Sequence, residues 1–181
     1  DRDIAVGIAT LEKVPGRLEE IPNKRNIKVL VDYAHTPDAL ENVLENVRMV
    51  TKNRLFVITG SAGDRDADKR PKMGKIAADL ADITVITDDE PYSESPAAIR
   101  QAILIGTTQS KAGNEIVEIP DRRQAIHETI RRAKPGDSVL IVGMGHQQHR
   151  VIGPNGLKEE WNDRSVAEEL LQIEQSDRNS S

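Results

Sequence analysis

The amino-acid sequence predicts a Rossmann-like α/β domain of three layers, in which a mostly parallel sheet is flanked by helices. Short apolar runs rich in β-branched residues recur along the chain, and segments with helical periodicity lie between them. Strands that alternate with helices form βαβ units, whose strands are parallel. The right-handed crossover of such units then places helices on both faces of the sheet.

Five apolar runs have the usual length of strands. They span residues 27–31, 55–59, 83–87, 116–119 and 138–142. The last four are continuously apolar rather than alternating, a pattern typical of strands that are buried on both faces. We therefore expect the sheet to be covered on both sides.

Five helices are expected between and after these strands. Thr36 and Pro37 supply an N-cap and a first-turn proline for a helix whose apolar stripe runs over 40–50. Further stripes cover 73–80, 99–103, 126–130 and 166–171. Asp121 precedes the fourth helix, and Asn162 or Asp163 is expected to cap the last.

Composition excludes several classes of protein. The 181 residues suffice for one α/β domain, and the net charge of −5 without a basic stripe argues against nucleic-acid binding. The absence of cysteine excludes disulfides and thiolate metal sites, and it suits the cytoplasm. No apolar run approaches the ~20 residues of a membrane span, and no signal peptide is recognisable.

The chain starts at Asp1 rather than Met, so we expect it to be cut from a longer protein. Residues 1–26 are interpreted as a lead-in from a preceding domain, and 27–174 as the domain itself. The polar residues 175–181 are expected to form a flexible tail.

Four loops that follow strands are rich in charge, glycine and histidine. They are 32–35, 60–66, 88–95 and 143–149, whereas a connection at the opposite edge, 134–137, is plainer. Ligands of open parallel sheets bind beyond the carboxyl ends of the strands, so this asymmetry predicts a binding site there. Arg65, within a Gly/Asp loop, is well placed to grip a carboxylate or phosphate with its planar fork.

Simpler interpretations exist for other residues in and near these loops. Asp32 and Asp64 could each cap a helix, and Lys69-Arg70 and Arg122-Arg123 have the pattern of solvated faces. His146 and His149 have no carboxylate or thiolate at ligand spacing, so no metal site is predicted.

The loops resemble those of the muramyl-tripeptide synthetases, a branch of the Mur ligase family. The resemblance runs in order over nearly the whole chain. It rests on Val31-Asp-Tyr-Ala-His-Thr-Pro-Asp-Ala-Leu40, Gly63-Asp-Arg-Asp66, Lys69-Arg-Pro-Lys-Met-Gly74, Thr87-Asp-Asp-Glu-Pro91, Gly143-Met-Gly-His146 and Asn162-Asp-Arg164. The lead-in, Val14-Pro-Gly-Arg-Leu-Glu19, is similar to the entry into the third domain of these ligases.

The resemblance implies an ATP-dependent ligase of three domains. Such enzymes activate the carboxylate of UDP-MurNAc-L-alanyl-D-glutamate as an acyl phosphate, and an incoming amino acid attacks it. The N-terminal domain binds the UDP substrate, and the central domain holds the P-loop and Mg²⁺. This chain has no G-x-x-x-x-G-K-[ST] motif, so we expect it to act with those two domains as partners and to be inactive alone.

The resemblance also implies roles for individual residues. Arg17, Asp32 and His35 are expected to contact ATP, Asp32 through the ribose and Arg17 through the phosphates after domain closure. Arg65 matches the arginine that grips the α-carboxylate of the incoming amino acid. Gly143, at the start of the Gly-x-Gly-His segment, is expected to contact the same amino acid.

The loop that selects the amino acid departs from the commonest pattern. Ligases for meso-diaminopimelate carry Asp-Asn-Pro-Arg where this chain has Asp89, Glu90, Pro91 and Tyr92, and they carry glutamate where it has Gln147. A distal carboxylate would meet Glu90 without an answering cation. We therefore predict an amino acid with a side-chain ammonium, L-lysine or ornithine, rather than diaminopimelate.

Other functions stay open at this point. A folylpolyglutamate or cyanophycin synthetase could carry a related domain, and the chain could be a binding module without catalytic partners. A nicotinamide dehydrogenase is disfavoured, because the first unit lacks a G-x-G-x-x-G fingerprint.

Overall fold

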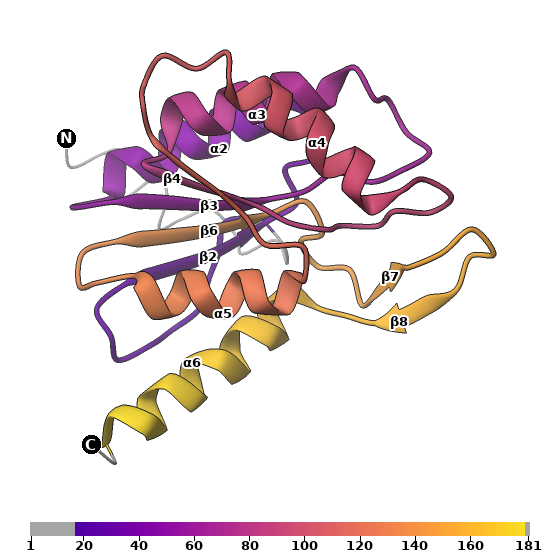
Figure 1. Ribbon diagram of the computed structural model, residues 1–181. Helices are drawn as coiled ribbons and strands as arrows, with labels where there is room; N and C mark the ends of the chain where they lie inside the picture. The colour runs from indigo at the N-terminus through magenta and orange to yellow at the C-terminus, as the bar shows by residue number, and fades with distance from the viewer. Residues whose placement is uncertain (1–16, 180–181) are drawn as a thin grey trace.

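A computed structural model describes residues 17–179, and it confirms the predicted α/β fold (Figure 1). The sheet has the strand order β1-β2-β6-β3-β4-β5. Five of its strands are parallel: β2 (Lys28–Asp32), β3 (Leu55–Thr59), β4 (Ile83–Ile86), β5 (Glu115–Glu118) and β6 (Ser138–Val142). The sixth, β1 (Glu19–Glu20), lies antiparallel to β2 at the edge.

Helices cover both faces of this sheet. Helices α2 (Pro37–Val50), α3 (Lys69–Leu80) and α4 (Pro96–Thr107) lie on one face, while α5 (Arg122–Arg132) and α6 (Asp163–Asn179) lie on the other (Figure 1). A hairpin of β7 (His149–Val151) and β8 (Lys158–Glu160) projects from the body of the domain. No helix among the described residues is long and apolar enough to cross a membrane.

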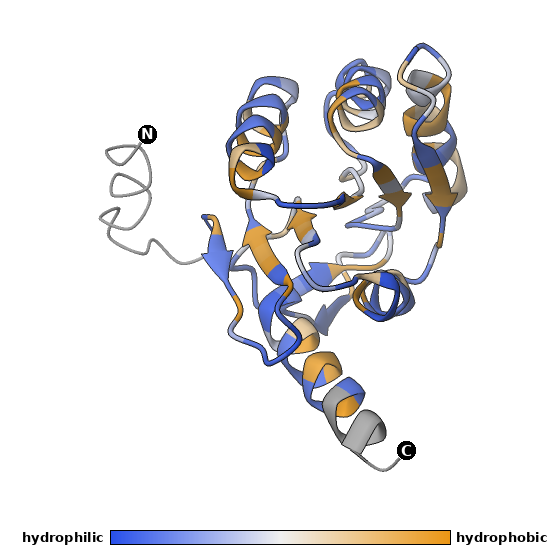
Figure 2. Cartoon of the chain, turned by 90° about the vertical axis from the view of Figure 1, so that its left-hand side faces the viewer, coloured by the Kyte–Doolittle hydropathy of each residue, from blue (hydrophilic) through white to orange (hydrophobic). Residues whose placement is uncertain are grey.

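Two apolar clusters form the core, one on each face of the sheet. Leu40, Leu44 and Met73 belong to the cluster under α2 and α3, and Ile126 and Leu170 belong to the cluster under α5 and α6. Figure 2 shows the inner strands as hydrophobic and β1 as hydrophilic. The side chains of β3 and β6 are buried throughout, as their continuous apolar sequences predict.

The helix starts follow the predicted capping. Thr36 Oγ1 accepts a hydrogen bond from Ala39 N–H, and Pro37 is the first residue of α2. Asp121 caps α5 through Gln124 N–H, at 2.7 Å. At α6 the cap is Asn162, whose Oδ1 accepts from Ser165 N–H at 3.0 Å. Asp163 is therefore free for another role.

Some elements differ from the prediction. Strand β5 is not buried on both faces: Glu115 and Glu118 are exposed and Ile116 and Val117 are partly buried, and the strand is the last in the order of the sheet. Strand β1 and the β7–β8 hairpin were not predicted, since two- and three-residue polar strands carry no apolar alternation. The backbone of α6 continues through residues 175–179, which the sequence assigned to the tail.

Candidate functional site

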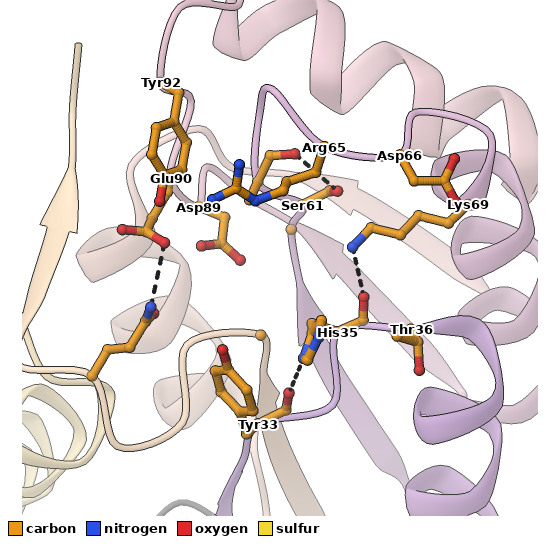
Figure 3. A pocket seen from close by; sticks show the side chains of 14 residues that line it. Tyr33, His35, Thr36, Ser61, Arg65, Asp66, Lys69, Asp89, Glu90 and Tyr92 are labelled. Carbon is orange, nitrogen blue, oxygen red and sulfur yellow. Dashed lines mark hydrogen bonds between the residues drawn. The ribbon is translucent and has the colours of Figure 1, made fainter. Parts of the chain in front are cut away.

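The predicted amino-acid site forms one cavity at the carboxyl ends of β3, β4 and β6 (Figure 3). Its volume is about 400 Å³. All six residues predicted to face the amino acid line it: Arg65, Asp89, Glu90, Tyr92, Gly143 and Gln147. They come from three loops far apart in sequence, and the parallel sheet brings these loops to a single edge.

The three residues predicted to contact ATP line a second cavity of about 480 Å³. These are Arg17, Asp32 and His35. Both cavities share Tyr33 and His35, so they adjoin at the end of β2. Asp32 does not cap a helix; its carboxylate accepts hydrogen bonds from Leu18 N–H and Ala34 N–H, both at 2.8 Å.

The loop after β3 is fastened to the loop after β4. Gly63 N–H donates to the Glu90 carbonyl oxygen at 2.7 Å, and a Cβ at Gly63 would lie 2.0 Å from the Pro91 carbonyl oxygen. Only glycine therefore fits this contact. Asp64, which does not cap a helix either, accepts from Ser93 N–H at 3.2 Å and from Ser93 Oγ–H at 2.6 Å.

An ion pair strengthens this connection. Arg70 is 4% exposed and donates to both oxygens of Glu94, at 2.7 and 2.8 Å, while Glu94 also accepts from Asp64 N–H. The hydrogen bonds from Arg70, followed by that from Asp64, lower the pKa of Glu94 to about 2. The expectation that Arg70 is solvated is wrong, because its guanidinium pairs with Glu94 and is buried between the two loops.

Arg65, by contrast, is exposed and has no carboxylate partner among the described residues. It donates one hydrogen bond, to the Asp64 carbonyl oxygen at 3.2 Å. Its guanidinium carbon lies 5.0 Å from the centre of the Tyr92 ring, within the range of a cation–π contact. Most of its donors are thus available to a ligand in the cavity.

Asp89 is a buried carboxyl group at the wall of the cavity. Burial raises its pKa to about 6, and the nearby Arg122 guanidinium opposes that rise. A Cβ at Gly143 would lie 2.6 Å from Asp89 Oδ2, and Gly143 has a φ of +112°. Glycine is therefore required at 143 for two reasons, close approach and backbone conformation.

Arg122 and Asp163 form a fully buried ion pair behind Asp89. Arg122 Nε and Nη2 donate to the two oxygens of Asp163, at 2.8 and 2.7 Å, and Nη2 also donates to the Val142 carbonyl oxygen. Both residues are 0% exposed, so the expectation that Arg122 is solvated is wrong. The one signal of this pair at the level of sequence is that Asp163 lies in the Asn-Asp-Arg motif.

Glu90 is buried, and its carboxylate contacts the base of the β7–β8 hairpin. Oε1 accepts from Val151 N–H at 2.9 Å, and Oε2 accepts from Gln147 Nε2–H at 3.4 Å (Figure 3). Of the two acids in the selecting loop, Glu90 is thus occupied by protein donors. Among the described residues, no side chain donates a hydrogen bond to Asp89; burial raises its pKa, and the backbone N–H of Glu90 lowers it slightly.

Lys69 is a cavity residue that the sequence analysis assigned to a solvated face. Its Nζ donates to the His35 carbonyl oxygen at 2.8 Å, and burial lowers its pKa. His35 and His146 lie beside Tyr33, with ring centres 4.7 and 5.7 Å away. Among the described side chains, those of residues 17–174, no group of three His, Asp or Glu could hold a metal ion.

Comparison with known proteins decides the family. Residues 16–145 match the family described as Mur ligase, glutamate ligase domain. The chain belongs to the Mur ligase family. A relative from Geobacillus kaustophilus, a UDP-N-acetylmuramoyl-L-alanyl-D-glutamate–2,6-diaminopimelate ligase, is 43% identical over 91% of the chain and 33% of the relative. One from Synechocystis with the same name is 46% identical over 87% and 31%.

Solved structures agree with this assignment. A diaminopimelate ligase structure is 34% identical and has a TM-score of 0.78, covering 91% of this chain and 33% of that one. A single domain from Haemophilus ducreyi, 18% identical with a TM-score of 0.54, shares the fold over 87% of this chain and 98% of its own length. This Mur ligase domain spans about a third of the length of the curated relatives it matches.

Proposed function

We propose that this Mur ligase domain is the third domain of a ligase that adds the third amino acid to UDP-MurNAc-L-alanyl-D-glutamate in peptidoglycan synthesis. It would receive the amino acid, deliver the amine to the acyl phosphate and close over ATP held by a central domain. The observation that carries this proposal is the meeting of all six predicted amino-acid residues in one cavity. The names of the relatives support it.

In this proposal the adjoining cavity takes part of the nucleotide. Arg17 would stabilise charge on the phosphates, and Asp32 and His35 would contact the nucleoside. The Asp32 carboxylate fits a ribose, because each oxygen accepts one backbone N–H and keeps a further lone pair for a hydroxyl. Mg²⁺ would be held mainly by the central domain. The isolated domain is then expected to bind ligands without catalysing, in the cytoplasm where ATP and the UDP substrate occur.

Arg65 and Asp89 would hold two charged groups of the incoming amino acid, its α-carboxylate and its side-chain ammonium. The exposed guanidinium suits the α-carboxylate, since a bidentate pair needs a planar fork without a prior partner. The Asp89 carboxylate suits an ammonium group, because it lines the cavity and has no side-chain donor among the described residues. Gly143 would leave the space for this contact.

For the identity of the amino acid we propose L-lysine or ornithine rather than meso-diaminopimelate. Tyr92 and Glu90 replace the arginine and asparagine of the diaminopimelate loop, so the distal end of the substrate meets a phenol and a carboxylate. The relatives are named for diaminopimelate, and this loop is where the chain departs from that pattern. Because Glu90 already accepts a hydrogen bond from Val151 N–H, we propose that Asp89 binds the side-chain ammonium.

Two experiments test these proposals. Calorimetric titration of the chain with L-lysine, ornithine and meso-diaminopimelate should show binding that Arg65→Ala weakens by at least about tenfold, given the strength of charge-assisted hydrogen bonds. The matched control Arg123→Ala, an exposed arginine paired with Glu169 on the opposite face, should bind as the wild type does. Equal binding by Arg65→Ala would contradict the assignment.

The second experiment measures ligation. This chain would replace the corresponding third of the Geobacillus kaustophilus ligase, and the products formed from each amino acid would be compared. Ligation of lysine or ornithine in preference to diaminopimelate supports the proposal. Preferred ligation of diaminopimelate overturns the amino-acid assignment, and a folded chimera that binds amino acids without ligating any favours a non-catalytic binding module.

A further inference from the structure

Arg65 binds a carboxylate more tightly if its side chain is held in the binding orientation before the ligand arrives. Its side chain is exposed and forms no ion pair with a described residue, and the one hydrogen bond it donates to a described residue is to the adjacent Asp64 carbonyl oxygen. A long arginine side chain that moves freely in solvent loses rotamer freedom when it grips a ligand, and this loss reduces affinity. The structure contains a neighbour that restricts the side chain in advance.

That neighbour is Tyr92. The Arg65 guanidinium carbon lies 5.0 Å from the Tyr92 ring centre, and Figure 3 shows the guanidinium extending across the cavity towards Tyr92 and Asp89. An aromatic face attracts a guanidinium without using its N–H donors, which stay available for a carboxylate. A carboxylate partner in the protein would instead occupy those donors.

The backbone around Tyr92 is arranged to present the ring. Tyr92 has a φ of +50°, in the left-handed region that a bulky residue rarely adopts. The flanking residues are tied together, because Ser93 donates to the Asp64 carboxylate from its backbone N–H and from its hydroxyl. Asp64 directly precedes Arg65, so the ring and the guanidinium start from backbones held at a fixed separation.

The ring also stays neutral. Burial, and then the Glu90 carboxylate, raise the pKa of the Tyr92 phenol above its usual value. A tyrosinate would add a negative charge beside the guanidinium and compete with the ligand's carboxylate. The neutral ring offers its face and makes no ion pair.

We propose that Tyr92 is a positioning residue, an aromatic platform that holds Arg65 in the orientation in which it binds the α-carboxylate of the incoming amino acid. This rests on the proposed function of Arg65. By the resemblance, diaminopimelate ligases carry at the position of Tyr92 an arginine that binds the distal carboxylate of their substrate. In this chain Tyr92 instead supports Arg65 at the proximal end of the substrate, and the distal ammonium is left to Asp89.

The test compares Tyr92→Asn with Tyr92→Phe in the 181-residue chain. Asparagine tolerates the left-handed backbone and removes the ring, whereas phenylalanine keeps the ring and removes the hydroxyl. In calorimetric titrations with L-lysine, Tyr92→Asn should bind about fivefold more weakly, the size expected of an exposed cation–π contact, and Tyr92→Phe should bind within about twofold of the wild type. In the Arg65→Ala background, Tyr92→Asn should have no further effect.

A second readout does not depend on binding. The Nε–Hε resonance of Arg65 should carry a ring-current shift in the wild type and Tyr92→Phe, and lose it in Tyr92→Asn. Equal weakening by Phe and Asn, unchanged binding by Asn, or an Arg65 resonance that ignores the ring would overturn the proposal. Absence of lysine binding by the wild type would overturn the proposed function together with the role of Tyr92 in it. A ring-current shift of the Arg65 resonance would in that case still show the contact between Arg65 and the Tyr92 ring.

Discussion

Two buried aspartates, Asp137 and Asp89, lie at opposite ends of the parallel strands, and their surroundings differ. Asp137, at the amino end of β6, accepts hydrogen bonds from the Arg54 side chain, from Arg54 N–H and from Lys134 N–H, at 2.8, 3.0 and 2.8 Å. Burial of Asp137 opposes its ionisation, but these donors prevail and lower its pKa. At the carboxyl edge, burial of Asp89 prevails and raises its pKa to about 6.

The contrast separates a structural carboxylate from a ligand-binding one. Both side chains leave water, but only Asp137 receives enough protein donors to offset that loss. Asp89 keeps unused acceptor capacity inside a cavity, next to an arginine, Arg65, that also lacks a carboxylate partner among the described residues. Unsatisfied groups at a cavity are what a zwitterionic ligand would complete.

The largest loss of stability is expected on substitution of Arg122, the buried cation behind Asp89. Arg122→Met leaves Asp163 buried without its partner and should lower the free energy of unfolding by about 4 kcal/mol, the usual cost of breaking a buried pair. It should also raise the pKa of Asp89 further. Urea denaturation measures the first effect, and Arg123→Met, at an exposed pair beside it, is the control. A loss no larger than that of the control would contradict the structural role of the pair.

Asp137→Ala should give the next largest loss. It leaves the backbone N–H groups of Arg54 and Lys134, in two part-buried hydrogen bonds, without their acceptor, which should cost about 2 kcal/mol. Affinity for the amino acid should stay unchanged, because the site is at the other edge. Denaturation and titration of one sample measure both. If Asp89→Asn destabilises the chain equally at neutral pH, the proposed difference between the two aspartates is wrong.

Asp89 should show its effect in the pH dependence of stability. Its folded-state pKa is raised, so the stability it contributes is fully present below its unfolded value near 3.8 and is lost as pH rises through about 6. Relative to wild type, Asp89→Asn should therefore gain on the order of 2 kcal/mol between pH 4 and pH 7. Melting curves across this range measure the gain. A stability difference between Asp89→Asn and wild type that does not change with pH would contradict the raised pKa of Asp89.

Glu94 should give the smallest effect, with the opposite sign. Its folded-state pKa is lowered to about 2, so the stability it contributes is present above its ordinary value near 4.5 and is lost as pH falls towards 2. Glu94→Gln should be slightly less stable than wild type at pH 7 and approach it at low pH. Thermal melts at several pH values measure this, and a difference that widens on acidification would contradict the pairing with Arg70.

The sequence predicted the parallel sheet well because strands such as 55–59 and 138–142 are continuously apolar. It also indicated the cavity residues, since the carboxyl ends of parallel strands meet at one edge. It could not predict that Arg122 and Arg70 are buried, because the carboxylates that hold them, Asp163 and Glu94, are 41 and 24 residues away. Burial of a charged residue depends on such tertiary partners, which no local pattern reveals.

The most direct test of the account is the titration of the Asp89 side-chain carboxyl by NMR, with and without saturating L-lysine. Asp137 provides the internal reference in the same spectra. We expect a pKa of about 6 for Asp89 in the free chain, a value below the usual range for Asp137, and a fall in the Asp89 pKa alone when lysine binds. An Asp89 pKa near 3.8 that lysine leaves unchanged would contradict the account.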